Sequence, residues 1–164
     1  MFNVEVEVNG IIDFIRTYYK KHNLKGAVIG ISGGKDSAVV AGLFVKALGS
    51  ENVIGVTLPC NSLLSDKDDA KKISEHYGFK LFNLELTSVF ESFKNEFSKE
   101  FNFDKLKDSD INLKPRLRMA SLYYIAQAIS SFKNEIYIVA GTSNYSESYV
   151  GYFTKGGDNI SDIS

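Results

Sequence analysis

The sequence is short of cysteine, proline and tryptophan: among 164 residues it has one, two and none of them. Cys60 alone can form neither an internal disulfide nor a cysteine-based metal site. No apolar run is long enough to cross a membrane. Glu5 and Glu7 stand near the start, where a signal peptide would be basic. We therefore expect a cytoplasmic protein with no membrane partner.

The sequence also lacks an excess of charge of either sign. Lys and Arg together number 19 and Asp and Glu 20, which gives a formal net charge of −1. Bulk electrostatics would then attract neither nucleic acid nor an anionic membrane, so we expect no nucleic-acid partner. A phosphate-bearing ligand would have to be held by local groups.

The length and the composition are those of a folded protein of one domain. Hydrophobic residues make up 44% and charged residues 24%, and we find no internal repeat, low-complexity tract or proline-rich linker. We therefore expect residues 1–164 to form a single domain.

Predicted strands and helices alternate along the chain. Short apolar runs predict strands at 27–32, 53–58, 80–86 and 136–141. Helical spacing of apolar residues predicts helices at 4–22, 36–48, 66–77, around 90–97 and at 115–132, and residues 98–112 read as a polar loop. This order predicts an α/β fold with a doubly wound, mostly parallel sheet in three α/β/α layers. Ligands of such folds bind outside the carboxyl ends of the strands.

A glycine-rich loop follows the first predicted strand and leads directly into a helix. Glycines there allow positive φ and a close approach of the backbone, and the first N–H groups of the helix favour an anion. The loop is neither a Walker A motif nor GxGxxG. An acidic residue in a phosphate loop suits a bridging Mg²⁺, so Asp36 is a candidate ligand; the alternative is an ordinary tight turn in which Asp36 caps the helix. The candidate phosphate-binding residues are Gly30, Ile31, Ser32, Gly33, Gly34, Lys35, Asp36 and Ser37.

The segment SGGKDS at 32–37 resembles the SGGxDS pyrophosphate-binding loop of the ATP pyrophosphatases. Further segments resemble the NAD synthetases within that superfamily. They are VTLPCNSLLSDKDDA (56–70), NLKPRLRM (112–119), GTSNYSE (141–147) and GYFTKGGD (151–158). The resemblance implies a Rossmann-like sheet of the ATP pyrophosphatase type.

The resemblance also implies an activity, in which ATP adenylates the carboxylate of deamido-NAD with release of pyrophosphate. Ammonia then displaces AMP to give NAD, and no nucleophilic side chain is needed, so we name no catalytic residue. Asp36 and Glu147 would bind Mg²⁺ and Thr142 would contact ATP. Arg116, Lys155 and Asp162 would hold deamido-NAD. A homodimer is implied in the same way, and the lack of a glutaminase portion implies ammonia as the nitrogen source.

The sequence departs from the family pattern at three places. Pro115 precedes the arginines of the 112–119 segment, which suits a position in a first helical turn. Residues 157–162 replace the usual GDGGxD. Family members continue beyond the point that corresponds to Ser164, with further ATP-contacting residues, so we expect the C-terminal part of the family domain to be missing and turnover by these 164 residues to be weak or absent. Two alternatives stay open: an inactive nucleotide-binding or dimerising remnant, and an ATP pyrophosphatase that adenylates another substrate.

Overall fold

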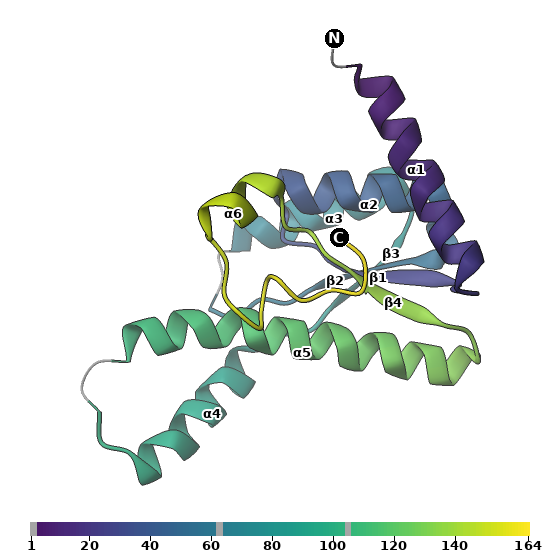
Figure 1. The fold of residues 1–164 in the computed structure, drawn as a ribbon. Coiled ribbons are helices and arrows are strands. Elements are labelled where there is room, and N and C mark those ends of the chain that lie inside the picture. Colours follow the sequence, from purple (N-terminus) through teal and green to yellow (C-terminus); the bar gives the residue numbers. More distant parts are fainter. Residues whose placement is uncertain (1–2, 62–63, 104–105) are drawn as a thin grey trace.

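The computed structural model of the protein describes residues 3–61, 64–103 and 106–164. Its helices and strands alternate along most of the chain (Figure 1). In chain order they are α1 (Val4–Lys21), β1 (Gly26–Gly30), α2 (Lys35–Leu48), the 3₁₀ turn η1 (Ser50–Asn52), β2 (Val53–Thr57), α3 (Leu64–Tyr77), β3 (Lys80–Asn83), α4 (Thr87–Glu100), α5 (Lys107–Lys133), β4 (Tyr137–Ala140) and α6 (Tyr145–Val150).

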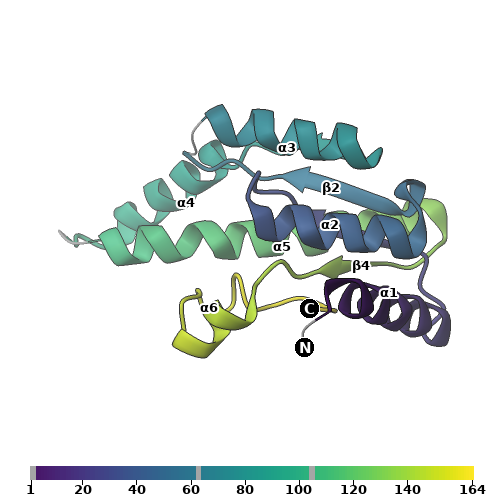
Figure 2. The same cartoon turned by 90° about the horizontal axis from the view of Figure 1, so that it is seen from above.

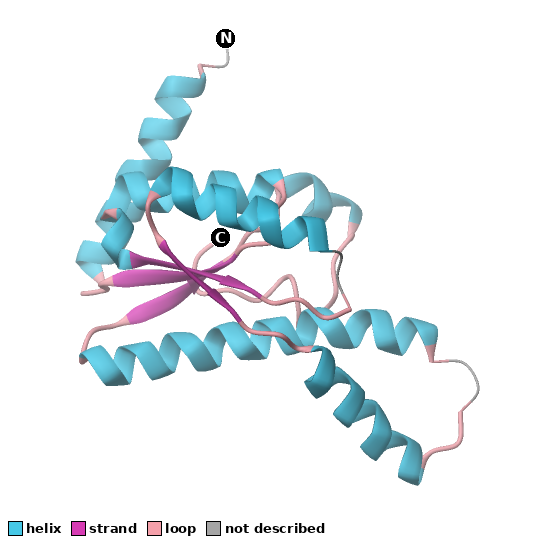
Figure 3. Ribbon diagram, turned by 180° about the vertical axis from the view of Figure 1, so that it is seen from behind, coloured by secondary structure: helices cyan, strands magenta, loops and turns pink. Residues whose placement is uncertain are grey.

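The four strands form one parallel sheet in the order β3-β2-β1-β4. Helices α1, α2 and α3 lie side by side over one face (Figure 2), and the long α5 runs along the other (Figure 3). The prediction of a parallel α/β sheet in three layers is therefore confirmed.

Both faces of the central strand β1 are buried, which explains its continuous apolar sequence. Ala27 and Ile29 pack on the side of α1 and α2, in the same cluster as Phe44. Val28 packs on the opposite side in a cluster with Ala126 of α5. Alternate residues of one strand thus join the sheet to both helical layers.

Helix α5 begins earlier than the sequence predicts. Residues 107–112, expected to belong to a polar loop, are helical, and Pro115 lies inside the helix rather than in its first turn. Contacts with neighbouring elements favour this extension, because Lys94 of α4 pairs with Asp110 at 2.8 Å. Helix α6 was not predicted at all.

The loop after α6 is held against the first half of α5. Thr154 Oγ1 donates to Asn112 Oδ1 at 2.9 Å, and Arg116 Nε donates to the carbonyl of Lys155 at 3.1 Å. Gly157 lies so close to the helix that a Cβ at this position would be 2.8 Å from Cβ of Pro115. The 154–157 segment is therefore fitted to the surface of α5 at the place where the helix carries proline.

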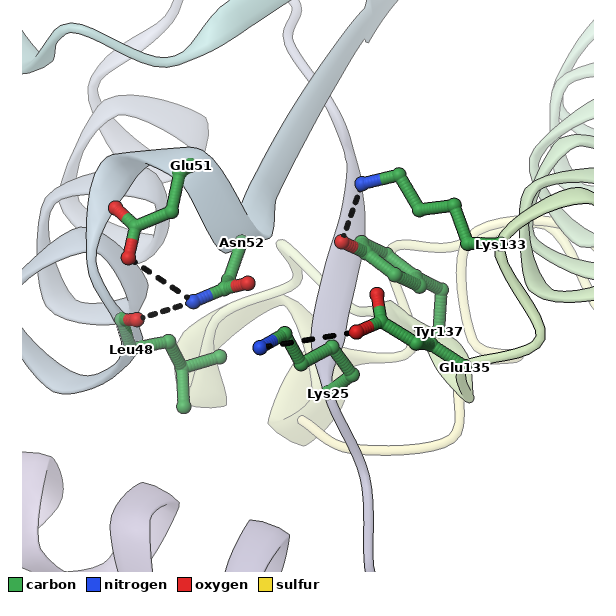
Figure 4. A network of polar contacts seen from close by, with 7 residues as sticks. All are labelled: Lys25, Leu48, Glu51, Asn52, Lys133, Glu135 and Tyr137. Carbon is green, nitrogen blue, oxygen red and sulfur yellow. Dashed lines mark hydrogen bonds and ion pairs between the residues drawn. The ribbon is translucent and has the colours of Figure 1, made fainter.

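Polar contacts fasten the opposite, amino-terminal end of the sheet (Figure 4). Lys133 donates to the hydroxyl of Tyr137 at 2.8 Å, and Lys25 pairs with Glu135 at 3.8 Å. Asn52 Nδ2 donates to the carbonyl of Leu48 at 2.8 Å. These contacts join the chain segments that lead into the strands, so they serve the fold.

No helix in the described part of the chain combines the length and the apolar character needed to cross a membrane.

The packing of Gly157 on Pro115 gives a prediction about stability. Gly157→Ala should lower the free energy of unfolding by about 1–3 kcal/mol, because the added methyl group overpacks a fitted contact. It should also speed amide hydrogen exchange in residues 152–158. Urea unfolding and exchange by mass spectrometry measure the two effects.

The matched control is Gly10→Ala in α1, where an added Cβ meets no heavy atom within 4 Å. This change should raise stability by roughly 0.5–1 kcal/mol, since alanine favours the helix. Equal effects of the two substitutions would contradict the packing described here.

Candidate functional site

A cavity of about 570 Å³ lies at the carboxyl ends of the strands. The loops after β1, β2 and β4 form its walls, together with the middle of α5. This is the position at which parallel α/β sheets bind ligands, and the volume is in the range of roughly 300–1,000 Å³ typical of small-molecule sites.

The loop between β1 and α2 is ordered by hydroxyl groups. Ser37 is buried, and its Oγ donates to the carbonyl of Gly34 at 3.0 Å and accepts from the N–H of Ser32 at 3.3 Å. Ser32 Oγ in turn accepts from the N–H of Gly34 at 3.2 Å. The two serines thus fix the backbone of the loop before any ligand arrives.

The backbone of this loop has the form expected of an anion site. Gly33 has φ of +84°, a conformation that favours glycine, whereas Gly34 has φ of −82° and begins the helix as its N-cap. Among the side chains that the structure describes, none caps α2 at Gly34. Asp36 therefore does not act as the helix cap, and the first N–H groups of α2 have no partner inside the helix.

Two carboxylates from different helices line the same cavity. Asp36 comes from the first turn of α2, and Glu147 comes from α6, beyond β4. Glu147 is held by a capping box: its N–H donates to Asn144 Oδ1 at 2.9 Å, and its Oε2 accepts from the N–H of Asn144 at 3.3 Å. Both side chains are half-buried.

The structure brings most of the predicted ATP-contacting residues together. Those that line the cavity are Gly30, Ile31, Ser32, Asp36, Ser37, Thr142 and Glu147. Gly33, Gly34 and Lys35 belong to the same loop but do not line the cavity, and Lys35 is exposed.

The three residues predicted to hold deamido-NAD lie outside the cavity wall. Arg116 and Lys155 meet where the loop after α6 crosses α5, through the hydrogen bond from Arg116 Nε to the carbonyl of Lys155. Asp162 lies at the outer edge of β4, where its Oδ2 accepts from the N–H of Val139 at 2.8 Å and its Oδ1 from the hydroxyl of Tyr123 at 3.3 Å. Partial burial and the Asp162 charge raise the pKa of Tyr123.

Sequence reasoning did not select Arg118 and Asp158, although both line the cavity. Arg118 is half-buried, and its Nε donates to the carbonyl of Leu58 at 3.0 Å. Asp158 Oδ2 accepts from the N–H of Thr154 at 3.0 Å, and its carbonyl accepts from Ser143 Oγ at 2.9 Å. Asp158 could have been selected from the sequence, because it is the last residue of the GYFTKGGD segment.

Cys60, which also lies in the loop after β2, is 1% exposed and does not line the cavity. Burial raises the pKa of its thiol, although the charges of Lys114 and Arg118 act in the opposite direction. A buried thiol with a raised pKa is a poor nucleophile.

Solved structures share this fold over nearly the whole chain. An NMN synthetase from Francisella tularensis aligns with a TM-score of 0.86 at 32% identity, over 99% of this chain and 64% of that one. An NH3-dependent NAD synthetase from Campylobacter jejuni aligns with a TM-score of 0.84 at 30% identity, over 99% and 66%.

Similarity in sequence points the same way. An NH(3)-dependent NAD(+) synthetase from Methanococcus aeolicus is 44% identical over 163 residues, which are 98% of this chain and 61% of the relative. The chain thus spans less than two thirds of the length of this relative. The family model described as NAD synthase matches residues 7–164, and the chain therefore belongs to the NAD synthase family.

Proposed function

We propose that this chain forms the ATP-binding part of an ammonia-dependent NAD synthetase. ATP would adenylate the carboxylate of deamido-NAD, pyrophosphate would leave, and ammonia would displace AMP to form the amide. The observation that carries the proposal is the cavity itself, which is lined by the loop before α2, by Asp36 from the first turn of α2 and by Glu147 from α6.

The loop after β1 would hold the ATP phosphates. Its fixed backbone, the positive φ of Gly33 and the first N–H groups of α2, which have no partner inside the helix, suit a phosphate that approaches the main chain closely. Thr142, across the cavity at the end of β4, would contact the same nucleotide. Backbone donors placed in this way stabilise charge that develops as pyrophosphate leaves.

Asp36 and Glu147 would hold Mg²⁺. No cluster of three or more His, Cys, Asp or Glu side chains fit for a metal occurs among the described residues. Two carboxylates nevertheless fit this ion, because Mg²⁺ in nucleotide sites commonly binds one or two carboxylates, substrate phosphates and water. When bound, the ion would neutralise phosphate charge, and the side chains of Asp36 and Glu147 would hold it.

Deamido-NAD would lie along the junction of α5 with the loop after α6. Arg116 and Lys155 supply positive charge there, and their backbone contact keeps the helix and the loop together. Asp162 would contribute from the edge of β4. Its hydrogen bonds from the N–H of Val139 and the hydroxyl of Tyr123 leave carboxylate lone pairs for a further hydrogen bond. We also infer a homodimer, which light scattering of the purified protein would measure.

Nicotinate mononucleotide is a second candidate for the acceptor. The structural match to an NMN synthetase favours this acceptor. A chain that uses it would be an ATP pyrophosphatase that adenylates a substrate other than deamido-NAD. The same ATP site and the same chemistry would serve either acceptor.

The proposed function predicts equal amounts of AMP, pyrophosphate and NAD from ATP, deamido-NAD and ammonium. Chromatography of the reaction mixture measures the products, with nicotinate mononucleotide in a parallel arm. Product from that arm alone would favour the mononucleotide. ATP binding without pyrophosphate release would favour an inactive remnant, and failure to bind ATP would contradict the proposal.

The Mg²⁺ role predicts the effect of neutralising Asp36. Asp36→Asn should raise the Mg²⁺ concentration needed for half-maximal ATP binding by about tenfold or more, because one charged ligand is lost. Titration calorimetry at several Mg²⁺ concentrations measures this. Asp13→Asn, on the exposed surface of α1, is the matched control and should leave the dependence unchanged. An unchanged dependence in Asp36→Asn would show that Asp36 does not bind the ion.

A further inference from the structure

Charge is unevenly distributed over the wall of the main cavity. Asp36, Glu147 and Asp158 are acidic, and Arg118 is the single basic side chain among the described residues that line the cavity. A triphosphate brings several more negative charges to such a site. Bound cations can neutralise the carboxylates, but the wall itself offers one positive group to the nucleotide.

Arg118 reaches the cavity from the face opposite the phosphate loop. It belongs to α5, which packs under β1 and β4, whereas the phosphate loop leads into α2 on the other face of the sheet (Figure 3). Leu58, whose carbonyl accepts the Arg118 Nε at 3.0 Å, directly follows β2 and also lines the cavity. Because β2 pairs with β1, Arg118 is fastened beside the end of the strand that carries the phosphate loop.

The hydrogen bond to Leu58 uses one of the five N–H donors of the guanidinium. Among the residues whose side chains the structure describes (3–61, 68–103 and 106–164), neither Nη atom has a hydrogen-bond or ion-pair partner. A half-buried guanidinium that is fixed through Nε and has both Nη groups without partners is suited to bind an oxyanion through two donors.

The two arginines of the 112–119 segment face different partners. Two residues correspond to about 200° around a helix, so Arg116 and Arg118 lie on nearly opposite sides of α5. Arg116 donates to the loop that carries Lys155, and Arg118 donates to the end of β2. Arg116 therefore lies on the side proposed for deamido-NAD, and Arg118 lies on the side proposed for ATP.

We propose that Arg118 binds the phosphates of ATP from the α5 side of the cavity, opposite the first turn of α2. The proposal rests on the proposed function, because it takes the cavity as the ATP site. It adds a substrate-binding residue to those that the family resemblance indicates, and it gives the two arginines separate substrates.

Calorimetric titration of the protein with MgATP and with adenosine, in the absence of any acceptor, tests this role. Arg118→Gln should weaken ATP binding by about 10- to 100-fold, the effect of losing a charged hydrogen-bonding partner, and leave adenosine binding unchanged. Arg118→Lys keeps the charge but loses the planar fork, so its ATP affinity should lie between those of Arg118→Gln and the unaltered protein.

Arg16→Gln is the matched control. Arg16 also donates through Nε to a backbone carbonyl, that of Ala47 at 3.2 Å, but it belongs to α1 and does not line the cavity. Its loss should leave ATP affinity unchanged.

The possible results separate this inference from the proposed function. If the unaltered protein does not bind ATP, the proposed function fails. If it binds ATP and Arg118→Gln binds equally well, the role of Arg118 is overturned. An equal loss of ATP and adenosine affinity in Arg118→Gln would also overturn it, because it would show that the arginine only supports the Leu58 segment.

Discussion

The pairing of β1 with a parallel strand on each side brings together the loops around which the candidate site is built. All four strands end at the same edge of the sheet, so the loops after β1, β2 and β4 meet although they are far apart in sequence. The burial of β1 on both faces keeps this arrangement fixed. Asp36 and Glu147, 111 positions apart in the printed sequence, share one cavity for this reason.

Electrostatic balance is the second constraint on the site. The protein has almost no net charge, so attraction of an anionic substrate depends on local groups. The groups that we propose for this role are the first N–H groups of α2, the cation that Asp36 and Glu147 would bind, and Arg118. The charged side chains of the described cavity wall are acidic except for Arg118. A contact between a basic side chain of this wall and the phosphates would therefore depend on Arg118.

The strands and the phosphate loop could be predicted from sequence because their signals are local. An apolar run followed by glycines defines β1 and its loop. The start of α5 could not be predicted, because Pro115 usually marks a first turn and the extension depends on contacts such as Lys94 with Asp110. Helix α6 has six residues, which is too short for a clear helical spacing of apolar residues. The sequence feature that indicated its start was the capping box of Asn144 and Glu147. Which arginine faces the cavity depends on the placement of α5, which spacing alone does not give.

The most direct measurement of the central claim is a crystal structure of the protein with Mg²⁺ and an ATP analogue that cannot be cleaved between the α and β phosphates. Our account predicts the triphosphate at the first turn of α2, beside Gly33 and Ser37, with the ion between Asp36 and Glu147 and Arg118 on the opposite side. A triphosphate bound elsewhere, or an empty cavity at saturating nucleotide, would contradict it.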